Sequence, residues 1–170
     1  MKPLFVIGFM GAGKSTVGGM AAALLERPFC DLDKEIEAAE GRNVDELFDA
    51  LGEEGFRAAE REVLERVSGH EDAVVACGGG VVTDAGSRAL LSETGDVVYL
   101  AVSPEEAMAR VGGETAGRPL LRGVRLDDAV ALLSSRERLY DAVADLTIFT
   151  VGHSPEELAG RIATWERGRS

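Results

Sequence analysis

A glycine-rich segment near the N-terminus constrains this chain more than any other feature. Residues 8–15 read GFMGAGKS and fit the pattern G-x-x-x-x-G-K-[ST]. The apolar run at residues 4–7 predicts a buried strand before the loop, and residues 14–25 predict a helix after it. A loop in this setting curls its backbone N–H groups around phosphate oxygens, and the helix adds the positive end of its dipole. The sequence therefore predicts a nucleoside triphosphate site that uses Gly11, Ala12, Gly13, Lys14, Ser15 and Thr16.

Each polar residue of the loop has a specific task in this chemistry. Lys14 is expected to reach the β- and γ-phosphates, the Ser15 hydroxyl to ligate Mg²⁺, and Thr16 to contact the α-phosphate. A second predicted strand, residues 29–33, ends in Asp31 and Asp33. Positions two apart in a strand face the same way, so both carboxylates can reach the site, one for Mg²⁺ and one for an acceptor hydroxyl. The alternative is a pair of solvated acids at a strand end.

The rest of the chain alternates apolar runs with helical patterns. Further strands are predicted at residues 73–77, 97–102 and 146–150. Helix starts are marked by Asn43 with Glu46 and by Ser-Pro-Glu-Glu at residues 103–106 and 154–157. Strands that alternate with helices predict an α/β fold with a parallel sheet covered on both faces. The 170 residues are enough for one domain, residues 1–170.

Charge and cysteine content exclude several classes of protein. The formal net charge is −12, which argues against a basic nucleic-acid face or a polybasic membrane patch. No stretch is long enough for a membrane span, and two cysteines are too few for a disulfide scaffold or a four-cysteine zinc site. We therefore expect a cytoplasmic protein. Because no extended apolar surface stripe requires a partner, we also expect a monomer. Cys30 and Cys77, on the second and third predicted strands, are either small core residues or a pair that oxidation could join.

Two arginines are candidates for holding an anionic substrate. Arg57 and Glu60 are three residues apart on one predicted helix, so Glu60 could orient Arg57, and Arg136 lies on a later helix. The planar guanidinium fork suits a carboxylate, but a surface ion pair and a solvated helix face explain the same pattern. The glycine triplet at residues 78–80 either lets a ligand lie against backbone or is a flexible turn.

A long irregular segment, residues 112–125, has the composition of a lid. It contains four glycines and the arginines 118, 122 and 125. An arginine that swings over the phosphates, Arg118, would neutralise charge on the transferring group and exclude water. The alternative is an exposed loop with solubilising charges.

Taken together, these motifs closely resemble shikimate kinase, and the likeness covers nearly the whole chain. The motifs are GFMGAGKST at residues 8–16, DLD at 31–33, GFR at 55–57 with Glu60, GGG at 78–80, RPLL at 118–121 and RERLY at 136–140. The resemblance implies a three-layer α/β/α P-loop NTPase with strand order 2-3-1-4-5, a substrate-binding segment at about 33–61 and a mobile lid. It also implies transfer of the ATP γ-phosphoryl group to the 3-hydroxyl of shikimate, in the route to chorismate and the aromatic amino acids.

Roles for individual residues follow from the resemblance. Shikimate would contact Asp33, Arg57, Glu60, Gly78, Gly79, Gly80 and Arg136; Ser15 and Asp31 would hold Mg²⁺; Lys14, Asp33 and Arg118 would be catalytic; Arg110 and Pro119 would lie on the adenine side. Where the family often has an arginine against adenine, this chain has His153, either an adenine contact or a solvated residue. Two rivals are another small-metabolite kinase of this fold, such as a gluconate kinase, and a non-catalytic nucleotide-dependent regulator.

Overall fold

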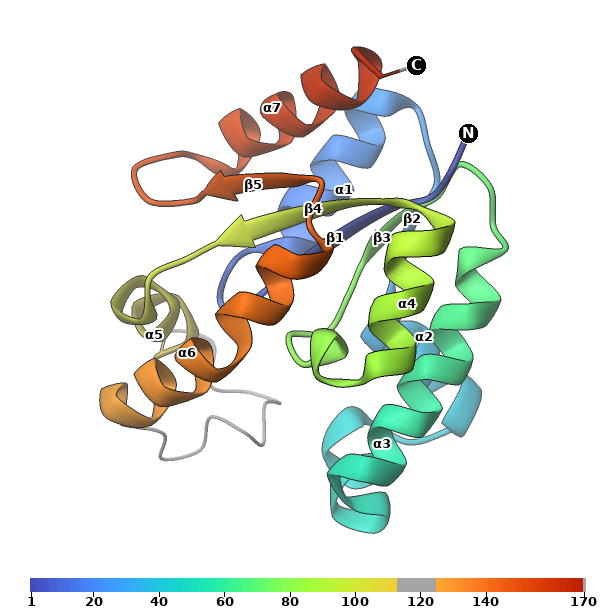
Figure 1. Cartoon of the computed structure of the whole chain (residues 1–170), viewed down its shortest axis with the longest axis vertical. Helices are drawn as coiled ribbons and strands as arrows, with labels where there is room; N and C mark the ends of the chain where they lie inside the picture. The colour runs from blue at the N-terminus through green and yellow to red at the C-terminus, as the bar shows by residue number, and fades with distance from the viewer. Residues whose placement is uncertain (113–124, 170) are drawn as a thin grey trace.

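A five-stranded parallel sheet forms the centre of the molecule (Figure 1). The computed structural model describes residues 1–112 and 125–169. The strand order is β2-β3-β1-β4-β5, the order that the resemblance implies. The strands are β1 Leu4–Gly8, β2 Phe29–Asp31, β3 Val74–Ala76, β4 Asp96–Ala101 and β5 Leu146–Phe149. Central β1 is buried along its whole length because it pairs on both sides: Phe5 lies opposite Val75 of β3 and Val97 of β4.

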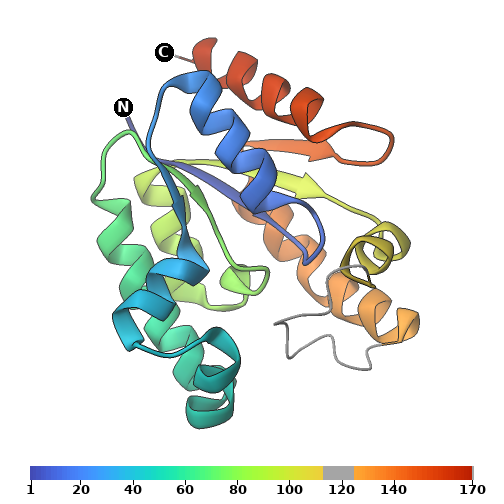
Figure 2. The same cartoon turned by 180° about the vertical axis from the view of Figure 1, so that it is seen from behind.

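Helices cover both faces of this sheet. Helices α1 and α7 pack together on one face, and α4 and α6 lie on the other, with α3 beside α4 (Figures 1 and 2). This is the predicted three-layer arrangement. The helices are α1 Lys14–Leu25, α2 Leu32–Glu40, α3 Val44–Ser68, α4 Ala85–Thr94, α5 Pro104–Gly112, α6 Leu126–Val143 and α7 Pro155–Arg167, with a 3₁₀ turn η1 at Val81–Thr83.

The predicted helix starts are confirmed by their capping contacts. The side chains of Asn43 and Ser154 each accept a hydrogen bond from the backbone N–H three residues on, and the carboxylate of the glutamate there accepts one from the backbone N–H of the cap residue. The Ser103 hydroxyl likewise accepts from the Glu106 N–H at 3.2 Å. These bonds satisfy N–H groups that a helix leaves without partners in its first turn.

The second strand is shorter than predicted. It ends at Asp31, not at residue 33, because the Asp31 carboxylate accepts a hydrogen bond from the Asp33 N–H at 3.2 Å and so caps α2. Asp33 lies in the first turn of that helix, so the expectation that both acids share one strand face is wrong. The other strand ends differ from prediction by one residue, where the last ladder hydrogen bonds stop.

The predicted helix at residues 44–51 and the helical pattern that follows it form α3, which breaks at Gly52. The φ of Gly52 is 68° and its ψ is 179°, a conformation that glycine adopts without a Cβ clash. The break separates a short first segment, which carries Phe48, from a longer one that carries Arg57 and Glu60. The carboxyl ends of β1, β2 and β3 all open toward this region, as ligand-binding edges of parallel sheets do.

Within the described residues, no helix is long and apolar enough to cross a membrane.

Candidate active site

One cleft of about 600 Å³ lies at the carboxyl ends of the strands. It is lined by Lys14 from the phosphate loop, Asp33 from α2, Arg57 from α3 and Arg136 from α6. The other described candidates also line it: Gly11, Ala12, Gly13, Ser15, Thr16, Asp31, Glu60, Gly78, Gly79, Gly80, Arg110 and His153. Arg118 and Pro119 lie outside the described residues, as does most of the predicted lid.

The phosphate loop has the tight backbone path that its glycines predict. Gly11 and Gly13 have φ values of 74° and 86°, which favour glycine. A Cβ at Gly11 would lie 2.7 Å from the carbonyl oxygen of Ala107 in α5, so a side chain has no room there. The Lys14 ammonium donates a hydrogen bond to the Phe9 carbonyl at 3.0 Å, which keeps the side chain folded over the loop. Lys14 is therefore held where phosphate oxygens would arrive.

Ser15 and Asp31 meet across the sequence. The Ser15 hydroxyl donates to Asp31 Oδ2 at 2.6 Å, while Oδ1 of the same carboxylate caps α2. Asp31 is thus fixed by the helix that follows it and aimed at the first turn of α1. A hydroxyl and a carboxylate are oxygen ligands of the kind that Mg²⁺ prefers, so this pair fits a magnesium site.

Arg57 and Glu60 form a buried pair. Arg57 Nη1 donates to Glu60 Oε2 at 2.6 Å, and Glu60 has no exposed surface. The guanidinium carbon lies 5.6 Å from the ring centre of Phe48 and 5.3 Å from that of Phe56, and the two rings are stacked. The alternative of a solvated surface pair is wrong. Phe48 was not among the sequence candidates. It lies in the first segment of α3, before the break at Gly52, and its ring faces the Arg57 guanidinium.

The Arg57–Glu60 pair keeps unused hydrogen-bonding capacity inside the cleft. Among the described residues, Arg57 Nε and Glu60 Oε1 are buried and have no hydrogen-bond partner. Burial raises the pKa of Glu60 from 4.5 to about 7, and the Arg57 charge and hydrogen bond act against this rise. A buried donor without a partner costs about 1–3 kcal/mol, so Arg57 Nε is ready for an anionic ligand.

The glycine triplet makes room for side chains of the cleft. A Cβ at Gly78 would lie 2.9 Å from both Asp33 Oδ1 and Glu60 Oε1, and a Cβ at Gly80 would lie 1.8 Å from Arg57 Nη2. The sequence predicted that the triplet lets a ligand approach backbone. The structure gives a further reason: the charged groups of the cleft occupy the space where side chains would stand.

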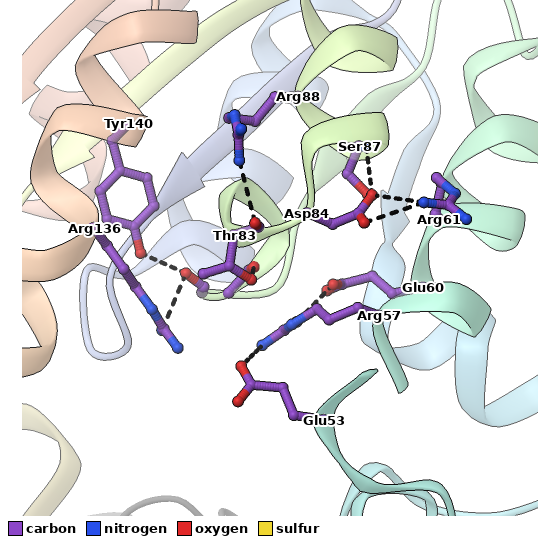
Figure 3. A network of polar contacts seen from close by, with 12 residues as sticks. Glu53, Arg57, Glu60, Arg61, Thr83, Asp84, Ser87, Arg88, Arg136 and Tyr140 are labelled. Carbon is purple, nitrogen blue, oxygen red and sulfur yellow. Dashed lines mark hydrogen bonds and ion pairs between the residues drawn. The ribbon is translucent and has the colours of Figure 1, made fainter. Parts of the chain in front are cut away.

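Arg136 reaches the same triplet from the opposite side. Its Nη1 donates to the Gly79 carbonyl at 3.5 Å, and the residue is 5% exposed, so a solvated helix face does not describe it. Figure 3 shows Arg136 and Arg57 on either side of the loop. Tyr140, one helical turn after Arg136, donates to the same carbonyl and was not among the candidates. The spacing of four residues between Arg136 and Tyr140 was the sequence signal that could have placed both side chains on the same face of the helix.

Arg110 and His153 also line the cleft. Arg110 Nη1 donates to the Gly11 carbonyl at 3.1 Å and also pairs with Glu106, so it braces the phosphate loop. The His153 ring lies 3.4 Å from Glu157 and 3.4 Å from Arg161. His153 lines the cleft and is also partly exposed, so both sequence interpretations of it stay open.

Cys30 and Cys77 are free thiols. Cys30 lies opposite Val75 in the β2–β3 pair, which places Cys77 two residues further along the same side of the neighbouring chain. Burial raises the pKa of the Cys30 thiol to about 11 and that of Cys77 well above its usual value. Because the thiolate is the reactive form, both thiols are poor nucleophiles at neutral pH.

Comparison with known proteins places the chain in a family. The family model described as "Shikimate kinase" matches residues 10–166. The chain belongs to the shikimate kinase family. A curated shikimate kinase of Francisella tularensis subsp. novicida is 40% identical over 169 residues, which cover 96% of this chain and 94% of the relative.

Solved structures of shikimate kinases have the same fold. The structure of shikimate kinase from Acinetobacter baumannii in complex with shikimate matches with a TM-score of 0.93 and 36% identity, over 100% of this chain and 95% of that one. Shikimate kinase from Bacteroides thetaiotaomicron matches with a TM-score of 0.88 and 31% identity, over 98% of both chains. The predicted family, fold and enzyme class are therefore confirmed, and the matches favour a shikimate kinase over a gluconate kinase or a non-catalytic regulator.

Proposed function

We propose that this shikimate kinase transfers the γ-phosphoryl group of ATP to the 3-hydroxyl of shikimate, giving shikimate 3-phosphate and ADP. One observation carries the proposal: a single cleft joins a phosphate loop to two buried arginines, Arg57 and Arg136, from different helices. A carboxylate-bearing acceptor and a triphosphate are both anionic. Such a cleft can hold them side by side although the whole chain has a net charge of −12.

Shikimate would be bound through its carboxylate by Arg57 and Arg136. Both side chains are nearly buried, so they are only weakly screened by solvent, and each offers a planar fork for two parallel hydrogen bonds. Glu60 holds one edge of Arg57 and so fixes the direction of the fork. Asp33, whose carboxylate lies beside Gly78, would take the shikimate hydroxyls.

The nucleotide would occupy the phosphate loop at the other end of the cleft. Lys14 would contact the β- and γ-phosphates, and Gly11, Ala12, Gly13, Ser15 and Thr16 line the same region. Ser15 and Asp31 would hold Mg²⁺, which supplies positive charge between the phosphate groups when it is bound. Arg110, Pro119 and His153 would lie toward the base, and Arg118 would cover the transferring group.

The chemistry would depend mainly on positioning. In phosphoryl transfer the charge of the transition state spreads over oxygens, and cationic side chains that are already in place stabilise it without reorganising. The acceptor hydroxyl must lose its proton, and Asp33 either takes it or only orients the hydroxyl. An Asp33→Asn variant that binds shikimate normally but is inactive would favour a base, and one that fails to bind would favour orientation.

A coupled ADP-release assay tests the acceptor directly. The enzyme is assayed with ATP, Mg²⁺ and one of shikimate, gluconate, a nucleoside monophosphate or no acceptor, with a Lys14→Ala protein prepared in parallel as the control. We expect ADP release that depends on shikimate and on Lys14. Turnover with gluconate or a nucleotide at the rate seen with shikimate would contradict the proposal.

We further propose that residues 1–170 act as one domain, as a monomer in the cytoplasm, without nucleic-acid or membrane partners. The two free thiols suit a reducing compartment. Light scattering coupled to size-exclusion chromatography measures the mass in solution, and a value near 36 kDa, twice the 18.0 kDa of the chain, would show a dimer instead.

A further inference from the structure

The carbonyl of Gly79 is held differently from those of its two neighbours. The Gly78 carbonyl accepts a hydrogen bond from the Val81 N–H at 3.2 Å, and the Gly80 carbonyl accepts from the Thr83 N–H at 2.9 Å. Within the part of the chain that the structure describes, the Gly79 carbonyl instead accepts from two side chains of α6, Tyr140 and Arg136. The middle of the triplet is thus fixed from another element, across the cleft edge (Figure 3).

We propose that the Tyr140 hydroxyl is a positioning group that sets the orientation of the Gly79–Gly80 peptide and of Arg136 for shikimate binding. This inference rests on the proposed function. Tyr140 does not touch the reacting atoms; it acts through the triplet and through Arg136, which share one carbonyl with it.

Peptide geometry explains how one hydroxyl can have this effect. A trans peptide is planar, so a carbonyl directed at α6 forces the N–H of the next residue, Gly80, to point away from α6. Three consecutive glycines have no Cβ to restrict their backbone, and without an external contact the central peptide could rotate. Such a rotation would also remove the acceptor that Arg136 uses.

The Tyr140 side chain is itself rigidly placed. It is fully buried, and its ring is stacked on that of Tyr99, with centroids 4.8 Å apart and planes 18° from parallel. Burial raises the pKa of Tyr140 above its usual value, so the hydroxyl keeps its proton, and with it its role as donor, across the working pH range. Arg136 is four residues earlier on the same helix, so both donors approach the carbonyl from one helical face.

The test compares two single-hydroxyl deletions. Tyr140→Phe removes the bond to Gly79 and keeps the stacked ring, and Tyr99→Phe removes the other hydroxyl of the same ring pair as the matched control. We expect Tyr140→Phe to raise the KM for shikimate about three- to tenfold, the effect of one hydrogen bond, with kcat and the KM for ATP changed less than about twofold. We expect Tyr99→Phe to leave all three constants near wild-type values.

The outcomes separate this inference from the proposed function. Wild-type protein that does not phosphorylate shikimate contradicts the proposed function itself. Active wild-type protein with an unchanged shikimate KM in Tyr140→Phe, or the same rise in both variants, overturns the role of Tyr140 alone. A purely structural role would lower the Tm without changing the KM.

A second measurement does not need Tyr140→Phe to fold. The chain has two tyrosines, so 3-fluorotyrosine incorporated into the Tyr99→Phe protein labels position 140 alone. We expect its ¹⁹F resonance to shift when shikimate is added. A resonance that stays unchanged at shikimate saturation would contradict a link between Tyr140 and the shikimate site at the glycine triplet.

Discussion

Replacing Gly80 by alanine should disable the carboxylate site without touching a charged residue. The φ of Gly80 is −99°, so alanine suits the backbone there, and the effect comes from contact alone. The new Cβ would lie 1.8 Å from Arg57 Nη2 and 2.4 Å from Cζ, whereas ordinary contacts begin at 3.4 Å. The guanidinium or the loop must therefore move by about 1.6 Å.

Arg57 has little freedom to make that move. Glu60 holds it at 2.6 Å and two stacked rings flank it, so a displacement of this size breaks the hydrogen bond to Glu60. Overpacking costs about 1–3 kcal/mol, and a broken buried ion pair costs more. We expect a loss of about 2–4 kcal/mol in the free energy of unfolding, or a Tm lower by about 4–15 °C for a chain of this length.

The loss of a charge-assisted contact of about 1.5–3 kcal/mol predicts a shikimate KM about 10- to 100-fold higher in Gly80→Ala. The KM for ATP should change little. Steady-state kinetics and differential scanning calorimetry measure both effects, with Gly160→Ala as the control, because a Cβ there meets nothing within 4 Å. A wild-type Tm together with a wild-type shikimate KM would refute the reasoning. A lower Tm with unchanged KM would show that Arg57 moves but does not bind shikimate.

Three further predictions concern the nucleotide end and Glu60. Lys14→Ala should lower kcat by about 10²–10³-fold, because a cation beside the transferring group is lost, while the circular dichroism spectrum stays unchanged. Ser15→Ala should raise the Mg²⁺ concentration needed for half-maximal activity, and Ser15→Thr, which keeps a hydroxyl, should not; equal requirements in both would argue against Ser15 as a ligand. Burial raises the pKa of Glu60 from 4.5 to about 7, so between these pH values the folded protein binds more protons than the unfolded chain. The stability that the protonated Glu60 contributes is therefore lost as pH rises through this window, and the Tm of the wild type should fall relative to that of Glu60→Gln from about pH 4.5 to 7. Parallel Tm curves for the two proteins would contradict a raised pKa.

The sheet could be predicted strand by strand because the apolar runs are short and clearly bounded: a glycine or an acid ends each of the first three, and Ser-Pro follows the run at residues 97–102. The strand order could not be derived in this way: periodicity shows that a strand is buried but not which strand lies beside it, and the resemblance supplied the order. The second strand shows a different limit. Asp-x-Asp suits the alternation of a strand and equally the start of a capped helix, and the hydrogen bond from the Asp33 N–H to Asp31 decides for the helix.

The candidate site was predictable where a motif fixes the backbone and less so where side chains meet across elements. Residues 8–16 lie where the phosphate-loop pattern predicts, because glycines and the following helix determine the path locally. The burial of Arg57 and Arg136 depends on what faces them from other helices, so helical spacing alone also allowed solvated positions. Tyr140 was missed for the same reason, since a tyrosine in a helix usually belongs to the core and only the contact with Gly79 sets it apart.

The three glycines at residues 78–80 are required by three different neighbours. A Cβ at Gly78 would meet the carboxylates of Asp33 and Glu60, one at Gly79 would lie 3.3 Å from the backbone nitrogen of Met10, and one at Gly80 would meet Arg57. The triplet therefore touches both the phosphate loop and the charged groups proposed to bind the acceptor. Because the triplet lies between these two groups, we expect a rotation of one of its peptides to change the distance between the proposed positions of the two substrates, and the proposed role of Tyr140 is to prevent that rotation.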